Sequence, residues 1–155
     1  WDEVININLK GPFLLLQSAL NHFMQNKYGK VIFTSSITGT IVSASGHAHY
    51  AATKSGLMGL VKTAAIELSQ YNININAIVP GNVMSDGMKL ERGDEYIKSQ
   101  SKSIPLGRLA STDEIGKLVS FLASDEASYI TGQGITIDGG QTIPENQDEV
   151  FHPKS

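Results

Sequence analysis

The chain of 155 residues contains no cysteine, which excludes disulfides and thiolate metal ligands. A reducing compartment is compatible with that absence, and we expect a cytoplasmic protein. Neither sign of charge dominates, because the formal net charge is −3 and the basic residues are scattered. No apolar run reaches the roughly 20 residues that a membrane-spanning helix needs. We therefore expect neither a nucleic-acid partner nor a membrane partner.

Length and composition indicate a single domain over residues 1–155. Hydrophobic residues make up 41% of the chain and charged residues 17%, as in ordinary globular proteins. A chain of this size can bury a substantial core. The first residue is Trp1, and the residues after it already have the pattern of a helix interior. We expect a piece of a longer domain that lacks its natural N-terminal part.

Apolar spacing along the chain alternates between that of helices and that of buried strands. Helices are predicted at residues 1–27, 49–70 and 111–124. The first has an irregularity at Gly11-Pro12 and an end at Gly29, and the last opens with a capping signal. Continuous apolar runs predict strands at residues 30–36, 73–80 and 134–140. The alternation predicts an α/β fold, a parallel sheet with helices on both faces.

The remaining segments have no sustained periodicity. Residues 37–49 are predicted to form a loop, and residues 82–110 a mobile loop with short helical pieces. The tail after Pro144 is polar and is expected to be loose.

The stretch YAATK places Tyr50 and Lys54 four residues apart, on one face of the predicted helix. Taken alone, this spacing also fits an ordinary amphipathic helix whose lysine buries its stem. Ligands of open parallel α/β sheets bind outside the carboxyl ends of the strands. Two predicted strands end at Ser35-Ser36 and Pro80-Gly81, so Ser36, Tyr50, Lys54 and the Pro80-Gly81 turn should meet at one rim.

Several motifs, in order, resemble the C-terminal part of a short-chain dehydrogenase/reductase: ININLKG, GKVIFTSSITG, YAATKSGLMGLVKTAAIEL, ININAIVPGNV and PLGRLASTDEIGKLVSFLASDEASYITGQGITIDGG. The resemblance covers almost the whole chain and is greatest to the group containing 3-oxoacyl-ACP reductases and sugar or polyol dehydrogenases. It implies the C-terminal portion of a Rossmann-like, doubly wound parallel sheet. The glycine loop for the cofactor phosphates and the residue that selects the cofactor lie outside that portion. The implied cofactor is therefore NAD or NADP.

The resemblance assigns Tyr50 as general acid/base, Lys54 as its partner, Ser36 as the anchor of the reacting oxygen and Asn8 as a fourth member. A phenol ordinarily titrates near pH 10, and a nearby ammonium favours its ionised form. In the family this serine stands three residues before a glycine, and Gly39 stands three residues after Ser36, so the resemblance selects Ser36 over Ser35. A hydroxyl that caps a turn is the alternative for Ser36. For Asn8 the alternative is an amide bonded to neighbouring backbone within the helix.

The resemblance also assigns cofactor contacts to Tyr50, Lys54 and the loop after the second strand: Pro80, Gly81, Val83 and Ser85. Glycine allows close approach of the backbone, and the Val83 backbone would meet the nicotinamide carboxamide. Ser85 stands where the family usually has threonine. A plain Pro-Gly turn is the alternative. No metal is expected, because His47 and His49 lack a third ligand at suggestive spacing and Asp138 fits a strand-ending turn.

The implied activity is hydride transfer between NAD(P) and a small carbonyl or secondary alcohol, although this piece alone could be inactive. A serine hydrolase is disfavoured because no G-x-S-x-G occurs. A non-catalytic nucleotide-binding protein or a structural fragment of the same fold stays open as the alternative. We also expect a homodimer or homotetramer through the first helix and the Tyr50 helix, where small residues permit close approach: Gly56, Gly59, Ala64 and Ala65. Packing of these residues in the core is the alternative.

Overall fold

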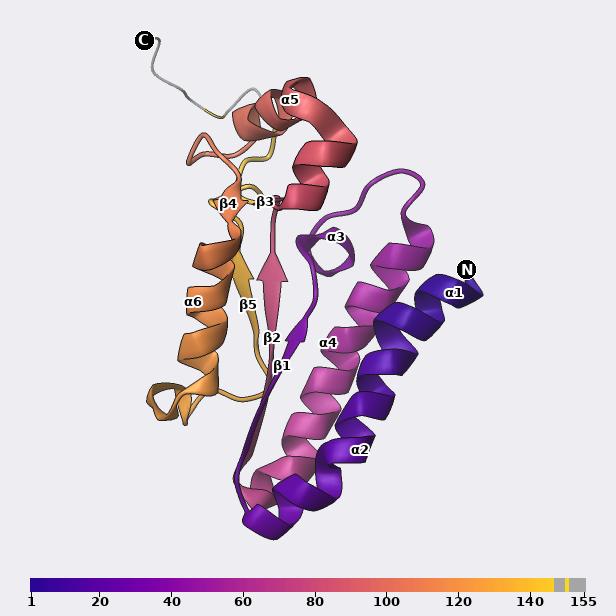
Figure 1. The fold of residues 1–155 in the computed structure, drawn as a ribbon, viewed down its shortest axis with the longest axis vertical. Coiled ribbons are helices and arrows are strands. Elements are labelled where there is room, and N and C mark those ends of the chain that lie inside the picture. The colour runs from indigo at the N-terminus through magenta and orange to yellow at the C-terminus, as the bar shows by residue number, and fades with distance from the viewer. Residues whose placement is uncertain (147–149, 151–155) are drawn as a thin grey trace.

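The structure, a computed structural model, describes residues 1–146 and 150. Its elements, in chain order, are α1 Asp2–Ile5, the π turn η1 Asn6–Lys10, α2 Gly11–Asn26, β1 Gly29–Thr34, α3 Ile37–Thr40, α4 Ala48–Leu68, η2 Ser69–Tyr71, β2 Ile73–Pro80, β3 Val83–Met84, α5 Asp86–Lys102, β4 Ala110–Ser111, α6 Thr112–Ala123, η3 Asp125–Ala127 and β5 Gly134–Ile137 (Figure 1). Most of the tail predicted to be loose, residues 147–149 and 151–155, lies outside the described residues.

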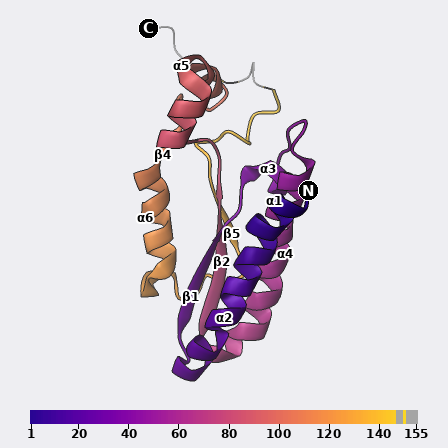
Figure 2. The same cartoon turned by 45° about the vertical axis from the view of Figure 1, so that its right-hand side comes forward.

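A three-stranded parallel sheet in the order β1-β2-β5 forms the centre of the fold. Helices α2 and α4 lie on one face of this sheet and α6 lies on the other, as the two ribbon views agree (Figures 1 and 2). The short strands β3 and β4 pair in parallel beyond the carboxyl ends of the main sheet. The predicted α/β fold, with helices on both faces of a parallel sheet, is thus confirmed.

The central strand β2 is buried on both faces, as is typical of a strand in a parallel sheet with helices on both sides. Ile73, Ile75 and Ala77 join the core under α2 and α4, whereas Ile78 packs with Leu122 of α6 on the other side. Each of these side chains is at most 1% exposed. Burying a side chain as large as Leu or Ile contributes about 1.5–3 kcal/mol to the free energy of unfolding. The side chains of β2 therefore stabilise the packing of both helical layers on the sheet.

The first helical segment is irregular where proline predicts it, but the irregularity takes a specific form. Pro12 has no N–H, so it cannot donate to the carbonyl of Asn8, four residues earlier. The chain instead makes the π turn Asn6–Lys10, in which the Gly11 N–H donates to the Asn6 carbonyl. The predicted end at Gly29 is wrong, because Lys27 adopts the left-handed conformation that closes α2 (φ 49°) and Gly29 opens β1.

Two predicted loops contain helices. Helix α5 occupies 17 residues of the segment predicted as a mobile loop with short helical pieces, and a break at Gly93, where φ is 74°, divides it into two such pieces. Its sequence is mostly polar and lacks a broad apolar stripe, so the helical period was hidden. The loop predicted at residues 37–49 begins with the single turn α3, and α4 starts at Ala48.

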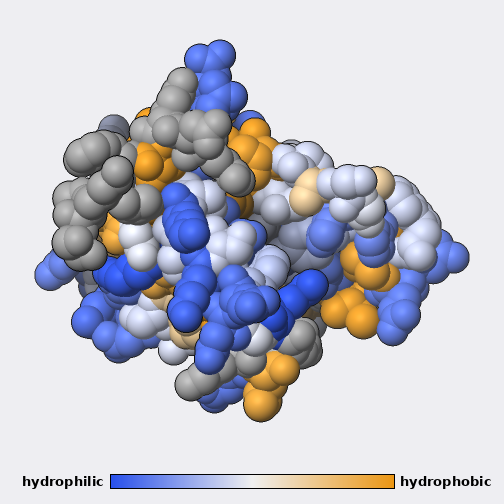
Figure 3. Space-filling model, turned by 90° about the horizontal axis from the view of Figure 1, so that it is seen from above, coloured by the Kyte–Doolittle hydropathy of each residue, from blue (hydrophilic) through white to orange (hydrophobic). Residues whose placement is uncertain are grey.

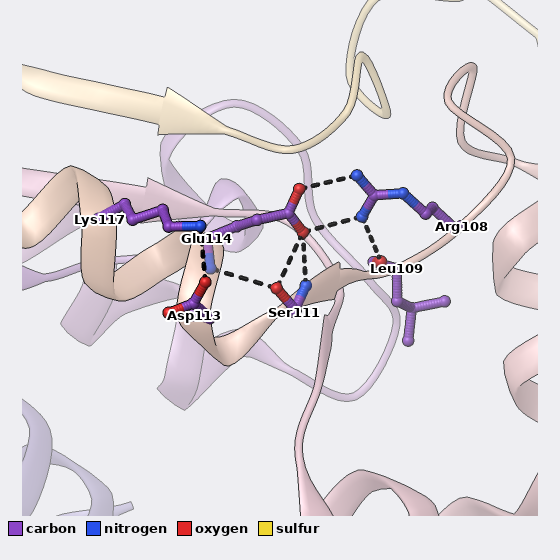
Figure 4. A network of polar contacts seen from close by, with 6 residues as sticks. All are labelled: Arg108, Leu109, Ser111, Asp113, Glu114 and Lys117. Atoms are coloured by element: carbon purple, nitrogen blue, oxygen red, sulfur yellow. Dashed lines mark hydrogen bonds and ion pairs between the residues drawn. The ribbon is translucent and has the colours of Figure 1, made fainter.

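Helix α6 begins with the predicted capping arrangement (Figure 4). The Ser111 hydroxyl accepts a hydrogen bond from the Glu114 N–H at 3.2 Å, and the Glu114 carboxylate accepts one from the Ser111 N–H at 2.8 Å. Arg108 donates two further hydrogen bonds to this carboxylate, at 2.7 and 2.8 Å. Mainly through these bonds, Arg108 lowers the pKa of Glu114 to about 2, so Glu114 holds the chain before α6 as well as capping it.

We predict that Ser111→Ala lowers the free energy of unfolding by about 1 kcal/mol, because the Glu114 N–H loses its acceptor. The experiment uses the full-length protein, meaning the complete gene product that contains these residues, and compares urea midpoints. Ser120→Ala is the matched control, since Ser120 is an exposed serine within the same helix. Equal midpoints for the two variants would show that the cap contributes nothing.

Candidate active site

A cavity of about 740 Å³ lies at the carboxyl ends of the strands, where ligands of parallel sheets bind. Ser36 after β1, Tyr50 in the first turn of α4, and Gly81 and Val83 after β2 all line it. Seen from above, this end of the molecule shows hydrophilic residues across its middle and hydrophobic residues in separate patches (Figure 3). Three of the residues predicted to meet at one rim, Ser36, Tyr50 and Gly81, therefore line one cavity, whereas Lys54 and Pro80 are not among its lining residues.

Tyr50 and Lys54 lie one turn apart on α4, and the Lys54 ammonium is 5.5 Å from the centroid of the Tyr50 ring. That separation is within the range of a cation–π contact. Lys54 Nζ also donates a hydrogen bond to the Thr34 carbonyl at 2.8 Å. Partial burial lowers the pKa of Lys54 below its ordinary value. An ammonium has three hydrogens to donate, so Lys54 retains donors for a ligand.

The two serines after β1 have different partners. The buried Ser35 hydroxyl donates to the backbone carbonyl of Lys54 at 2.9 Å. The Ser36 hydroxyl accepts from the Thr38 N–H at 3.1 Å and caps α3, so the capping alternative for Ser36 is present in the structure. A hydroxyl that accepts one hydrogen bond still has its own hydrogen to donate. Ser36 can therefore cap the turn and bind an oxygen in the cavity.

Gly39 sets the distance between the turn after Ser36 and helix α4. Its φ of 97° lies in the region that favours glycine, and a Cβ there would be 2.4 Å from the Ala51 carbonyl oxygen. The Ser55 hydroxyl donates to the Gly39 carbonyl from the same side. The glycine thus lets the Ser36 turn pack directly beside the residue that follows Tyr50.

Asn8 lies apart from the Tyr50 cavity, in the π turn between α1 and α2. It lines a second cavity, of about 630 Å³, together with Thr34 and Lys54. Within the described part of the chain, its amide has no hydrogen bond to neighbouring backbone, contrary to the alternative considered for it. Lys54 lines the Asn8 cavity and contacts the Tyr50 ring, so it connects the two groups.

The four loop residues with predicted cofactor contacts occupy different settings. Pro80 ends β2, and Gly81 follows at the rim, where a Cβ would lie 2.7 Å from Gln141 Oε1. Val83 lies in β3 beside the cavity. The Ser85 hydroxyl caps α5 by accepting from the Met88 N–H at 3.1 Å. Sequence reasoning missed this cap because it did not predict α5.

Sequence reasoning also missed a chain of amide side chains in the cavity. Gln141 Oε1 accepts from the Asn82 N–H at 3.1 Å, and Asn82 Nδ2 donates to Gln100 Oε1 at 2.8 Å. These residues are too distant in sequence for any spacing to have revealed them. Of the two histidines, His47 lines the cavity, with its ring edge-to-face to that of Tyr50 at 6.4 Å, and His49 does not.

The described residues hold no group of three or more His, Cys, Asp or Glu side chains placed to bind a metal ion. Across residues 1–146, no helix has both the length and the apolar composition to cross a bilayer.

Residues 1–142 match the family described as Enoyl-(Acyl carrier protein) reductase. This match extends over most of the chain and agrees with the parallel sheet and with the rim at its carboxyl ends. The chain belongs to the short-chain dehydrogenase/reductase family, which confirms the resemblance noted from its motifs.

Individual relatives have several activities in their names. The 3-oxoacyl-[acyl-carrier-protein] reductase of Rickettsia felis is 42% identical over 143 residues, which cover 92% of this chain and 58% of that protein. The crystal structure of a gluconate 5-dehydrogenase from Burkholderia cenocepacia in complex with NADP and tartrate matches with a TM-score of 0.85 and 29% identity, over 92% of this chain and 56% of that one.

A 3-oxoacyl-[acyl-carrier protein] reductase with bound NAD from Brucella melitensis matches with a TM-score of 0.81 and 32% identity, over 93% of this chain and 52% of that one. The chain thus spans a little over half the length of the relatives that it matches.

We predict that Ser35→Ala lowers the free energy of unfolding by about 1 kcal/mol, the typical net contribution of one hydrogen bond. The buried hydroxyl ties α4 to the end of β1 through the Lys54 carbonyl. Urea unfolding of the full-length protein measures the loss. Ser45→Ala, at an exposed serine of the following loop, serves as the control. A Ser35 variant as stable as this control would disprove the attachment.

Proposed function

We propose that the full-length protein is an oxidoreductase that transfers a hydride between NAD or NADP and a small carbonyl or secondary alcohol. The observation that carries the proposal is the pairing of Tyr50 with the Lys54 ammonium, 5.5 Å from the ring centroid, beside the Ser36 hydroxyl at the rim. Proteins of this family with bound NADP and NAD support the cofactor. The cytoplasmic location stays a prediction.

In this proposal, Tyr50 is the proton donor or acceptor of the reaction. In the direction of reduction, its hydroxyl gives a proton to the carbonyl oxygen, and in the direction of oxidation the phenolate takes a proton from the alcohol. Ser36 donates a hydrogen bond to the same oxygen and holds it near Tyr50. The positive charge of Lys54 stabilises the phenolate form of Tyr50.

The residues at the rim fit a nicotinamide cofactor. Lys54 is partly buried and has ammonium hydrogens beyond the one given to Thr34, which suits the hydroxyls of a ribose. Gly81 and Val83 line the cavity beside Tyr50, and Lys54 lies next to that cavity through its contact with the Tyr50 ring. When bound, the nicotinamide supplies or accepts the hydride. We assign its contacts to Tyr50, Lys54, Pro80, Gly81, Val83 and Ser85, and we place Asn8 as a partner of Lys54 through solvent.

The serine-hydrolase alternative gains no support from the contacts of Ser36. Its hydroxyl is bonded to the Thr38 N–H, and the ring of His47 is bonded to the Ser45 carbonyl. A general base for Ser36 would need hydrogen-bond contact with the hydroxyl. The non-catalytic alternative makes the opposite prediction to ours for substitution of Tyr50.

We predict that Tyr50→Phe in the full-length protein decreases kcat by about 10²–10⁴-fold, the range of a positioned acid or base. Its affinity for the cofactor should change little, because the ring and its packing remain. Lys54→Ala should both decrease kcat and raise the Kd of the cofactor, because Lys54 tunes the phenol and holds the ribose. Absorbance of the reduced nicotinamide measures turnover, and calorimetry measures the Kd.

Tyr129→Phe is the control for this experiment, since Tyr129 is fully exposed. If turnover of the Tyr50 variant stayed near that of this control, Tyr50 would be a packing residue and the non-catalytic alternative would be favoured. An unchanged cofactor Kd for Lys54→Ala would remove only the ribose contact.

We also propose assembly through the outer face of α2 and α4, in a homodimer or homotetramer. Large apolar side chains are exposed there, including Phe13 and Leu14 of α2 and Ile66 of α4, which is 78% exposed. The small residues named for this contact differ in role. Ala64 and Ala65 are in the core, and Gly56 packs against Leu9 within the chain, so their prediction as contact residues is wrong. Gly59 alone of the four faces open space.

We predict that Gly59→Arg converts the full-length protein to monomer, because the new side chain would enter the contact between α4 and its copy. A Cβ at Gly59 meets nothing within 4 Å in this chain, so folding of the single chain should not suffer. Gly116→Arg, at an equally open glycine of α6, should leave the α4 contact intact. Sedimentation velocity at micromolar concentration makes the comparison, and an associated Gly59 variant would refute this contact.

A further inference from the structure

The cavity beside Tyr50 is lined by side chains that carry no full charge, both apolar ones, such as Val42, Val83 and Met88, and polar ones. Amides and hydroxyls from four separate segments reach it, and none of the described residues that line it is Asp, Glu, Lys or Arg. A negatively charged substrate would therefore find no ion-pair partner among them.

The chemistry that Gln141 offers to the cavity is fixed by its own partner. Its side-chain oxygen lies 3.1 Å from the Asn82 N–H, and a backbone N–H can only donate. This contact identifies which end of the amide is the oxygen, and the Gln141 NH₂ remains as a donor. Asp138 holds the turn that carries Gln141 by accepting from the Gly140 and Thr142 N–H groups, both at 2.9 Å. These two hydrogen bonds fix the conformation of the turn that carries the Gln141 NH₂ donor.

His47 offers the opposite chemistry. Its Nδ1 lies 3.0 Å from the Ser45 carbonyl oxygen, which can only accept, so Nδ1 must carry the hydrogen. In the neutral ring Nε2 is then an acceptor, and it has no hydrogen-bond partner among the described residues. The ring packs edge-to-face on that of Tyr50 at 6.4 Å between centroids, and both residues line the same cavity.

We propose that the substrate is a neutral molecule with further hydroxyl groups near the reacting carbon, a polyol or the corresponding ketose, and that His47 and Gln141 each bind one of those hydroxyls. The inference rests on the proposed function. A hydroxyl donates to His47 and accepts from Gln141, so one kind of group satisfies both residues. A carboxylate accepts only and would leave His47 without a partner. The thioester carbonyl of a 3-oxoacyl group also only accepts and would leave His47 without a partner. An unsubstituted ketone would leave both residues without one.

Two substitutions change only the chemistry that faces the cavity. Gln141→Glu keeps an oxygen for the Asn82 N–H and replaces the donor with an acceptor. His47→Asn keeps a donor for the Ser45 carbonyl and removes the acceptor from the position of Nε2, which the shorter asparagine side chain does not reach. His49→Asn is the control, because His49 does not line the cavity. Unfolding midpoints should stay unchanged in all three, which separates a specificity role from a structural one.

The experiment measures kcat/KM of the full-length protein with D-sorbitol and D-fructose, and with cyclohexanone, gluconate and acetoacetyl-CoA for comparison. We expect the highest values for sorbitol or fructose. Each cavity variant should lower these values by roughly 3- to 10-fold, the range of one lost hydrogen bond, mainly through KM. The values for cyclohexanone should stay within a factor of two of wild type, on the order of measurement noise in such free-energy comparisons, and His49→Asn should match wild type.

Higher kcat/KM for acetoacetyl-CoA or cyclohexanone than for both hydroxylated probes would overturn the inference and leave the proposed function standing. Unchanged kcat/KM values for sorbitol and fructose in both cavity variants would likewise overturn the inference without affecting the proposed function. No turnover of any probe with either cofactor would reject the proposed function. In that case calorimetry of sorbitol with wild type and the two variants still decides: binding that the variants weaken supports the assignment, and absent binding rejects it.

Discussion

The attachment of Lys54 to the end of β1 at two points holds the candidate site together. The ammonium donates to the Thr34 carbonyl at 2.8 Å, and the backbone carbonyl of Lys54 accepts from the Ser35 hydroxyl at 2.9 Å. Thr34 and Ser35, which are adjacent at the end of β1, thus bind the side chain and the backbone of Lys54 in α4. A shift of the helix along the strand would break both contacts, so the first turn of α4, with Tyr50, is fixed relative to the sheet.

This attachment carries an electrostatic cost, since a partly buried ammonium loses water and its pKa is lowered. The Thr34 carbonyl and the face of the Tyr50 ring offset part of that cost. The same geometry leaves hydrogens of the ammonium free to bind a ligand. A fully solvated lysine would have no desolvation cost, but no contact would hold its ammonium beside Tyr50.

The sequence predicted those elements whose own residues determine them. Strand β2 has the predicted bounds because its apolar residues recur from Ile73 up to Pro80, and α6 starts where Ser111 and Glu114 form a cap. Pro12 predicted an irregular helix, but the π turn ahead of it depends on which carbonyl the next N–H reaches. The extent of helix α5 was not predicted, beyond short helical pieces in its segment, because its sequence is mostly polar.

The candidate site was predictable only where topology fixes it. The ends of two parallel strands and one helical turn were enough to group Ser36, Tyr50 and Gly81. The amide pair of Asn82 and Gln141 joins segments 59 residues apart, and no local pattern records such a contact. Glycines show the same limit, since Gly56 lies against Leu9 and Gly59 lies open on the same helix. The residue type shows which contacts are sterically possible at a position. Which contact forms, with the core, with a ligand or with a second chain, depends on the segment that packs beside that residue.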